Sequence, residues 1–157
     1  MHQGRVVLIL LTMIAAFAVG IHFFTSIIAP PESGQTVLSF DLSRPRTPSE
    51  ARKLVNPIPV SEEVIQQGNA LFHGKGNCFV CHGDTGKGDG EAGVLLVPKP
   101  TNLTDPNLHM LRRDGEIFWA MRYGIEGTGM FAYVPRHITE EEAWTIVHYV
   151  KTLKAEP

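Results

Sequence analysis

The polarity of the chain changes abruptly along its length. Residues 6–29 form a run of 24 positions without an Asp, Glu, Lys or Arg side chain. About 20 apolar residues are enough for a helix to cross the hydrocarbon part of a bilayer. We therefore expect residues 1–29 to be a single transmembrane anchor. Because Arg5 and the free amine precede the run, the N-terminus is expected in the cytoplasm and the rest of the chain on the other side.

The same segment can also be interpreted as a cleaved secretory signal. The apolar part of such signals is usually about 7–15 residues long, which is shorter than this run. Ala16-Phe17-Ala18 resembles a cleavage site, but cutting there would leave the apolar stretch Val19–Ala29 on the mature protein. An uncleaved signal anchor is therefore the preferred interpretation.

Residues 30–60 have a different character. Six of the eleven prolines of the chain fall here, among Ser, Thr and charged residues. Proline stiffens a segment and keeps it extended, so this region is predicted to be a linker, with one or two helical turns between Thr47 and Val55. Residues 61–157 are then expected to form the folded domain.

A first amphipathic helix is predicted after Ser61, because a capping hydroxyl followed by Glu62 and Glu63 is typical of a helix start. Apolar positions follow with helical spacing at Val64, Gly68, Leu71 and Phe72. A glycine in this stripe lowers helix propensity by about 1 kcal/mol. A second helix that crosses close to Gly68 would explain its presence.

The last helix is the obvious partner for that crossing. Thr139 and Glu142 form a capping box ahead of an apolar stripe that runs to Leu153. Between the two, Asp114–Gly124 reads as a shorter helix capped by Asp114 and closed by Gly124.

Composition limits the kinds of partner. Residues 30–157 carry 13 basic and 16 acidic side chains without a basic stripe, so nucleic acid is not expected to bind. This part of the chain is small, polar and rich in Pro and Gly, and short chains bury a smaller fraction of their surface. A bound apolar group would supply core surface that the side chains lack.

The run Cys78-Phe79-Val80-Cys81-His82 predicts what that group is. Two thiols separated by two residues can form thioethers with the two vinyl groups of one haem, and the following His82 can bind its iron. A zinc site would need further ligands, and the chain has no third cysteine. A thioredoxin-like redox pair would need a βαβ context, which the surrounding sequence lacks. We therefore expect one covalently attached haem c.

A second axial ligand for the iron is sought after the motif. Met130 follows the glycine-containing loop 124–129, which could carry a thioether across the face of a haem. Met110 and His137 remain alternatives. Met121 lies in a helical pattern, where a Met is more often core filler, and His148 lies within the last helix. Met130 is the preferred ligand, since a His/Met pair is typical of high-potential electron-transfer haems.

At this point the chain resembles the monohaem class I cytochrome c family. The residues that carry the resemblance are Gly68–Phe72, Cys78–His82, Gly86–Gly90, Pro98–Asp105, Asp114–Gly124, Gly127–Met130 and Glu141–Leu153. The resemblance implies an all-α cytochrome c fold, about three to five helices around one haem, with His82 proximal and Met130 distal.

It also implies two contacts outside the iron ligands. Gly68 and Phe72 would contact Tyr149 on the last helix, and a carbonyl of Pro98 or Pro100 would accept the Nδ1–H of His82 and fix its tautomer. The family usually has proline after the distal Met, where this chain has Phe131.

The function expected from these features is one-electron transfer without bond chemistry. The anchored arrangement is similar to small cytochrome c subunits of respiratory complexes. It implies a single-pass protein of the inner (plasma) membrane with its haem domain on the periplasmic side, and as partners other subunits and redox proteins. The rival interpretation is a haem sensor or gas-binding protein in which Met130 does not bind the iron.

Overall fold

The structure is a computed structural model, and it describes Met13 and residues 46–154. Apart from Met13, the predicted anchor of residues 1–29 lies outside the described residues, as does the linker up to residue 45. Among the helices of the described part, none is long and apolar enough to cross a membrane.

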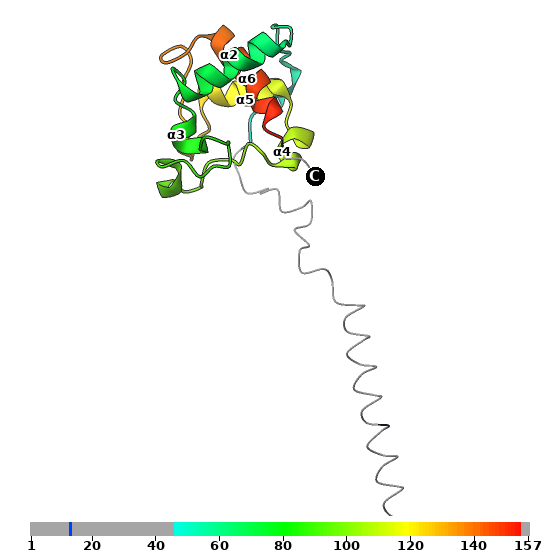
Figure 1. Ribbon diagram of the computed structural model, residues 1–157, viewed down its shortest axis with the longest axis vertical. Helices are drawn as coiled ribbons and strands as arrows, with labels where there is room; N and C mark the ends of the chain where they lie inside the picture. The colour runs from blue at the N-terminus through cyan, green and yellow to red at the C-terminus, as the bar shows by residue number, and fades with distance from the viewer. Residues whose placement is uncertain (1–12, 14–45, 155–157) are drawn as a thin grey trace, which may run out of the picture. The chain divides into compact units, whose positions relative to one another are not determined.

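The described residues form helices connected by long loops, without a strand (Figure 1). The expected all-α class is therefore confirmed. In chain order the elements are η2 (Ser49–Lys53), α2 (Glu62–His73), α3 (Phe79–His82), η3 (Gly93–Leu95), α4 (Pro106–Leu111), α5 (Asp114–Tyr123) and α6 (Glu140–Thr152).

The two predicted amphipathic helices begin where their caps place them. The Ser61 hydroxyl accepts a hydrogen bond from the Val64 N–H at 3.2 Å, at the start of α2. In the capping box of α6, the Glu142 N–H donates to the Thr139 hydroxyl at 3.1 Å, and the Thr139 N–H donates to the Glu142 carboxylate at 2.7 Å. In each helix, therefore, the cap side chain satisfies one N–H of the first turn.

Helices α2 and α6 cross at Gly68, as predicted. A β-carbon at this position would lie 2.5 Å from the Thr145 carbonyl oxygen, so the missing side chain is what lets the two backbones approach. The ring of Phe72 packs edge-on against Tyr149, with centroids 5.3 Å apart. The contact expected between the first and last helices is confirmed.

The core lies between these helices and α5. Phe118 of α5 stacks on Trp144 of α6 with ring centroids 4.0 Å apart. Phe72, Ile138, Ile146 and Val147 are the largest fully buried side chains of the described residues. Burial of such side chains contributes about 1.5–3 kcal/mol each, so this cluster fixes the frame on which the loops are held.

The described part of the predicted linker packs against the helices. Ala51 in η2 is fully buried. The Asn56 side-chain amide donates to the Trp144 carbonyl at 3.0 Å, and Nε2 of His148 lies 2.8 Å from the Ile58 carbonyl oxygen. The predicted helical turns between Thr47 and Val55 are present as η2. The folded unit therefore begins before residue 61, by at least a dozen residues of this segment.

Two local details differ from expectation. Helix α4 was not predicted, although Asp105 caps it by accepting from the Asn107 N–H at 2.8 Å, with Pro106 at its first position. The cap residue of α5 is Arg113 and not Asp114, which is the first helical residue. The expected end of α5 at Gly124 is confirmed.

Candidate haem-binding site

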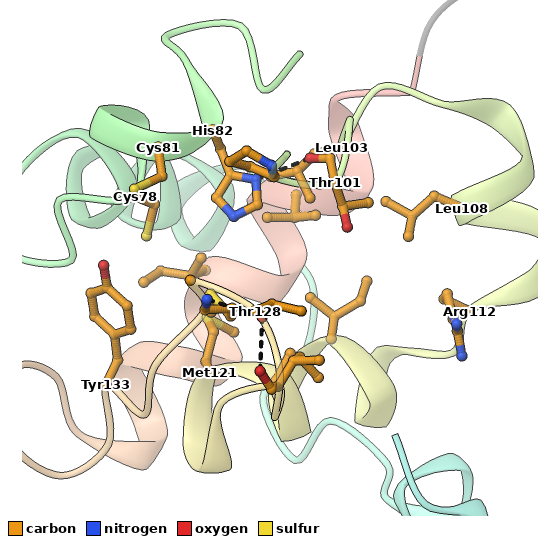
Figure 2. Close-up of a pocket in the computed structure, with 18 of the residues that line it drawn as sticks. Cys78, Cys81, His82, Thr101, Leu103, Leu108, Arg112, Met121, Thr128 and Tyr133 are labelled. Atoms are coloured by element: carbon orange, nitrogen blue, oxygen red, sulfur yellow. Dashed lines mark hydrogen bonds between the residues drawn. The ribbon is translucent and has the colours of Figure 1, made fainter. Parts of the chain in front are cut away.

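A largely apolar cavity separates two walls of the helical unit. One wall comes from α3 and the loop that follows η3, and the other from α5 and the loop after it. Figure 2 shows Cys78, Cys81 and His82 on one side of this space, with Met121, Thr128 and Tyr133 across from them. The space between the lining atoms is about 1380 Å³, a value that includes solvent at its open mouth.

The helices described above supply the rest of the lining. Apolar side chains from four of them close the cavity, among them Phe72, Leu108, Ile117, Ile146 and Val150, and Ile138 joins them from the loop before α6. Several of these belong to the buried core, so the cavity is an extension of the core and not a surface groove.

The two cysteines enter the cavity from the start of α3. Cys78 is held there by its own N–H, which donates to the Phe72 carbonyl at 2.9 Å at the end of α2. Cys81 follows one turn later, and both side chains are free thiols that are partly buried. Burial raises the pKa of Cys78 to about 12. This thiol is therefore neutral at physiological pH.

His82 is the last residue of α3, and its imidazole is held by a backbone carbonyl. Its Nδ1 lies 3.0 Å from the Thr101 carbonyl oxygen. Because a carbonyl oxygen can only accept, Nδ1 carries the proton and Nε2 keeps the lone pair that a metal needs. His82 therefore has the tautomer of a metal ligand.

The expectation that this carbonyl belongs to Pro98 or Pro100 is wrong. The acceptor is Thr101, the residue after Pro100. Pro98 and Pro100 both line the cavity beside His82, so they remain candidates for contact with a bound group. A backbone acceptor leaves no trace in side-chain identity, so the sequence offered no means of choosing among neighbouring carbonyls.

Met130 lines the cavity from a loop with its own hydrogen bonds. The Thr128 hydroxyl donates to the Ile125 carbonyl at 2.8 Å and accepts from the Met130 N–H at 3.1 Å. The Ile125 N–H donates to the Met130 carbonyl at 2.8 Å. These bonds hold the Met130 backbone on the rim of the cavity.

The other candidate ligands are placed differently. Met110 is 66% exposed, and neither it nor the exposed His137 lines the cavity. Nε2 of His148 faces the Ile58 carbonyl oxygen. Met121 does line the cavity, but it is buried in α5 and belongs to the core cluster. Of the candidate distal ligands, therefore, only Met121 and Met130 line the cavity.

The polar end of the cavity contains a buried ion pair. Glu116 is 4% exposed, and its carboxylate accepts from Nη1 of Arg112 at 2.9 Å and from the Arg113 N–H at 3.0 Å. Burial alone would raise the pKa of Glu116, but these hydrogen bonds and the Arg112 and Arg52 charges hold it below its usual value. Glu116 is thus a carboxylate at neutral pH.

Several cavity residues were missed by sequence reasoning. Thr101, Tyr133, Arg112 and Glu116 all line it. Burial raises the pKa of Tyr133 to about 12, so its phenol stays protonated. Glu116 lies in the first turn of the predicted helix, where a carboxylate is favourable. Such a carboxylate is usually exposed to solvent, so this position does not by itself predict a buried cavity residue.

The apolar run Val94–Val97 walls one side of the cavity only in part. Leu96 lines the cavity, whereas Leu95 is 83% and Val97 92% exposed. The run passes through η3 into an extended segment, so successive side chains point in different directions.

These residues fit a covalently bound haem. The cavity offers an apolar interior, two thiols one turn apart, an imidazole with its lone pair on Nε2 and a thioether from Met130. A flat apolar macrocycle with a central iron uses each of these groups.

Comparisons with known proteins agree with this fit. The family model described as Cytochrome c matches residues 65–154. A chain of the solved Kuenenia stuttgartiensis reducing HAO-like protein complex Kustc0457/Kustc0458 is similar at 23% sequence identity and a TM-score of 0.52. That alignment covers 65% of this chain and 50% of the other, so this chain spans about half the length of that neighbour. At this identity the likeness concerns the fold alone. No curated protein matches the sequence.

Proposed function

The chain belongs to the cytochrome c family, whose cofactor is covalently attached haem c, and we propose that it carries single electrons with His82 and Met130 as axial ligands of the iron. The iron supplies the redox change between its ferric and ferrous states. The chain must hold the haem, exclude water from it and present one of its edges to a partner protein.

The Nδ1 contact of His82 is the observation that carries this proposal. The 3.0 Å contact with the Thr101 carbonyl restrains the imidazole, and in its neutral form Nε2 carries the lone pair. The proximal imidazole is therefore held in position by the chain itself, which keeps the structural change at this ligand small on electron transfer. A fixed environment of this kind favours a carrier over an enzyme that must bind and release a substrate.

Met130 is the preferred ligand on the other side. Its loop is held by Thr128, and its side chain lines the cavity from outside the helices. Met121 could reach the cavity as well, but its main chain is fixed in α5, where its carbonyl accepts from the Tyr133 N–H at 2.8 Å. Moving Met121 would disturb both a helix and the buried core, whereas Met130 lies in a loop and is only partly buried against that core.

Electron exchange is proposed to occur through an exposed apolar rim. Val94, Leu95, Val97 and Phe131 are each more than half exposed. The two segments adjoin, because a β-carbon at Gly129 would lie 2.6 Å from the Leu96 side chain. A small apolar surface beside a redox centre suits brief docking with a partner protein.

The proposal includes the anchor. The uncharged run of residues 6–29 after Arg5 supports a single-pass protein of the inner membrane with its haem domain on the periplasmic side. Haem c is attached outside the cytoplasm, which agrees with this orientation. We further propose that the protein is a subunit of a respiratory membrane complex. The fold neighbour is itself part of a protein complex.

Carbon monoxide distinguishes the carrier from a gas-binding sensor. The reduced full chain, loaded with haem, is mixed with carbon monoxide while its visible spectrum is recorded. If Met130 holds the sixth position, the spectrum stays unchanged over minutes at neutral pH, and Met130→Ala gives the spectrum of a carbon monoxide adduct. Rapid binding to the native protein would favour the sensor.

Membrane fractionation tests the anchor and the complex. We expect the full chain to remain with the membrane after a high-salt wash and to be released by detergent together with other subunits. Recovery of the haem protein in the soluble periplasmic fraction would contradict the anchor.

A further inference from the structure

The polar end of the cavity is built partly by residues that precede the family-matched region 65–154. We call residues 47–54, which contain η2, the strap. Thr47 lines the cavity, and its hydroxyl donates to Oε1 of Glu116 at 3.3 Å. Nη1 of Arg52 lies 3.8 Å from Oε2 of the same carboxylate. The strap therefore contacts both oxygens of Glu116.

Gly115 lets the strap lie this close to α5. A β-carbon at residue 115 would overlap the Ala51 carbonyl oxygen and lie 2.6 Å from the Leu54 carbonyl oxygen. The strap backbone thus rests directly on the first turn of α5, next to Glu116, and the fully buried Ala51 closes the contact.

Glu116 in turn holds Arg112. The pair is separated by 2.9 Å, and the side chains are 18% and 3% exposed for Arg112 and Glu116 respectively. A guanidinium has five N–H donors, and an Arg–carboxylate bond restricts its plane. Since Arg112 also lines the cavity, the Glu116 carboxylate determines how its guanidinium is presented there.

Arg112 lies where the propionate edge of a bound haem would be. The vinyl groups that join the two thiols lie on one edge of the macrocycle, and its two propionate carboxylates lie on the opposite edge. Figure 2 shows Arg112 at the end of the cavity away from Cys78 and Cys81. Two guanidinium groups, those of Arg112 and Arg52, approach the single carboxylate of Glu116. Additional negative charge is therefore favourable at this end.

We propose that Arg112 binds a propionate of the attached haem and that the strap, acting through Glu116, positions the guanidinium for it. Residues ahead of the cytochrome c region thereby become part of the haem pocket. This inference rests on the proposed function, because it requires haem at Cys78 and Cys81.

The reduction potential of the haem-loaded full chain tests the contact. A cation near the iron favours the reduced form, which carries less positive charge. Arg112→Gln should therefore lower the potential, and Arg112→Lys, which keeps the charge, should lower it less. Arg113→Gln is the matched control: it removes the same charge from an exposed neighbour, and the backbone N–H that binds Glu116 remains. Equal shifts for Arg112→Gln and Arg113→Gln would overturn the proposal.

A double-mutant cycle tests the strap through a substitution that itself changes no charge. Gly115→Ala should displace the strap and shift the potential in the same direction as Arg112→Gln. In the Arg112→Gln background it should add nothing, because the group that it positions is absent. Thr47→Val is the milder variant if Gly115→Ala does not fold. Equal shifts in both backgrounds, or no shift in either, would overturn the role of the strap.

Two further readouts separate this inference from the proposed function. Each sample is first checked for covalent haem, which remains on the denatured chain, and for the sulfur-to-iron band of a Met ligand. Loss of either from the native protein contradicts the proposed function. If both are present, a crystal structure of the loaded protein should show Arg112 within hydrogen-bond distance of a propionate oxygen. A guanidinium that contacts no propionate would overturn the inference alone, even if no variant can be prepared.

Discussion

Gly68 and Tyr149 face one another so closely that a β-carbon at residue 68 would lie 2.8 Å from the Cβ of Tyr149. The pair lies where α2 crosses α6, and the ring of Phe72, one turn further along α2, packs against the same tyrosine. Because Phe72 also lines the cavity, this crossing fixes the position of one cavity wall.

Gly68→Ala should therefore destabilise the fold even though alanine is the better helix former. The added methyl group meets the Thr145 carbonyl oxygen, which belongs to the α6 backbone and cannot turn away. Overpacking of this kind costs about 1–3 kcal/mol. Denaturant unfolding of the haem-loaded protein measures the loss. Asn69→Ala, on the exposed side of α2, is the control and should change stability by less than about 0.5 kcal/mol. Equal stability of the two variants would contradict a tight crossing.

Acid should weaken the native protein partly through Glu116. The pKa of this carboxyl is held below its usual value of 4.5 in the folded state, so it contributes stability above that pH and loses it as the pH falls through the folded pKa. Glu116→Gln leaves Arg112 without its carboxylate and should cost about 3 kcal/mol at pH 7.

The difference between native protein and Glu116→Gln should become smaller as the pH falls below 4.5. Unfolding curves recorded across this range check the trend, with Glu91→Gln, an exposed carboxyl, as the control. A difference that stays constant down to the acid transition would show that Glu116 does not act as a charged group.

Thr128→Val should loosen the Met130 loop. The substitution removes both the bond to the Ile125 carbonyl and the acceptor of the Met130 N–H. Each such bond contributes about 0.5–1.5 kcal/mol. We therefore expect Met130 to leave the iron more readily, with a roughly tenfold gain in the rate of carbon monoxide binding to the reduced protein. Thr128→Ser keeps the hydroxyl and should restore the native rate. An unchanged rate in Thr128→Val would show that the Thr128 hydrogen bonds do not help to hold Met130 on the iron.

The sequence was sufficient wherever a short stretch decides the structure. The caps of α2 and α6 and the stripe through Gly68 and Phe72 predicted both helices and their crossing. These features depend on side chains three or four residues apart, whose interactions are local. Helix α4 was missed although its start follows the same rules, since Asp105 and Pro106 are a cap and a favoured first residue.

Features that join distant parts of the chain were not predictable in this way. The Thr101 carbonyl is a backbone group and looks like any other in the sequence. The strap carries no apolar periodicity, and its attachment depends on Gly115 and Glu116, more than 60 residues later. A proline-rich composition therefore predicted a linker where residues 47–58 in fact pack against the helices.

The central claim is that His82 and Met130 bind one haem iron from opposite sides. The visible and near-infrared spectrum of the oxidised native protein, compared with that of Met130→Ala, tests it most directly, and Met121→Ala serves as the control for the other cavity methionine. We expect the native protein to show a sulfur-to-iron charge-transfer band. Met121→Ala should retain this band and Met130→Ala should abolish it. Absence of the band from the native protein, or its presence in Met130→Ala, would show that Met130 does not bind the iron.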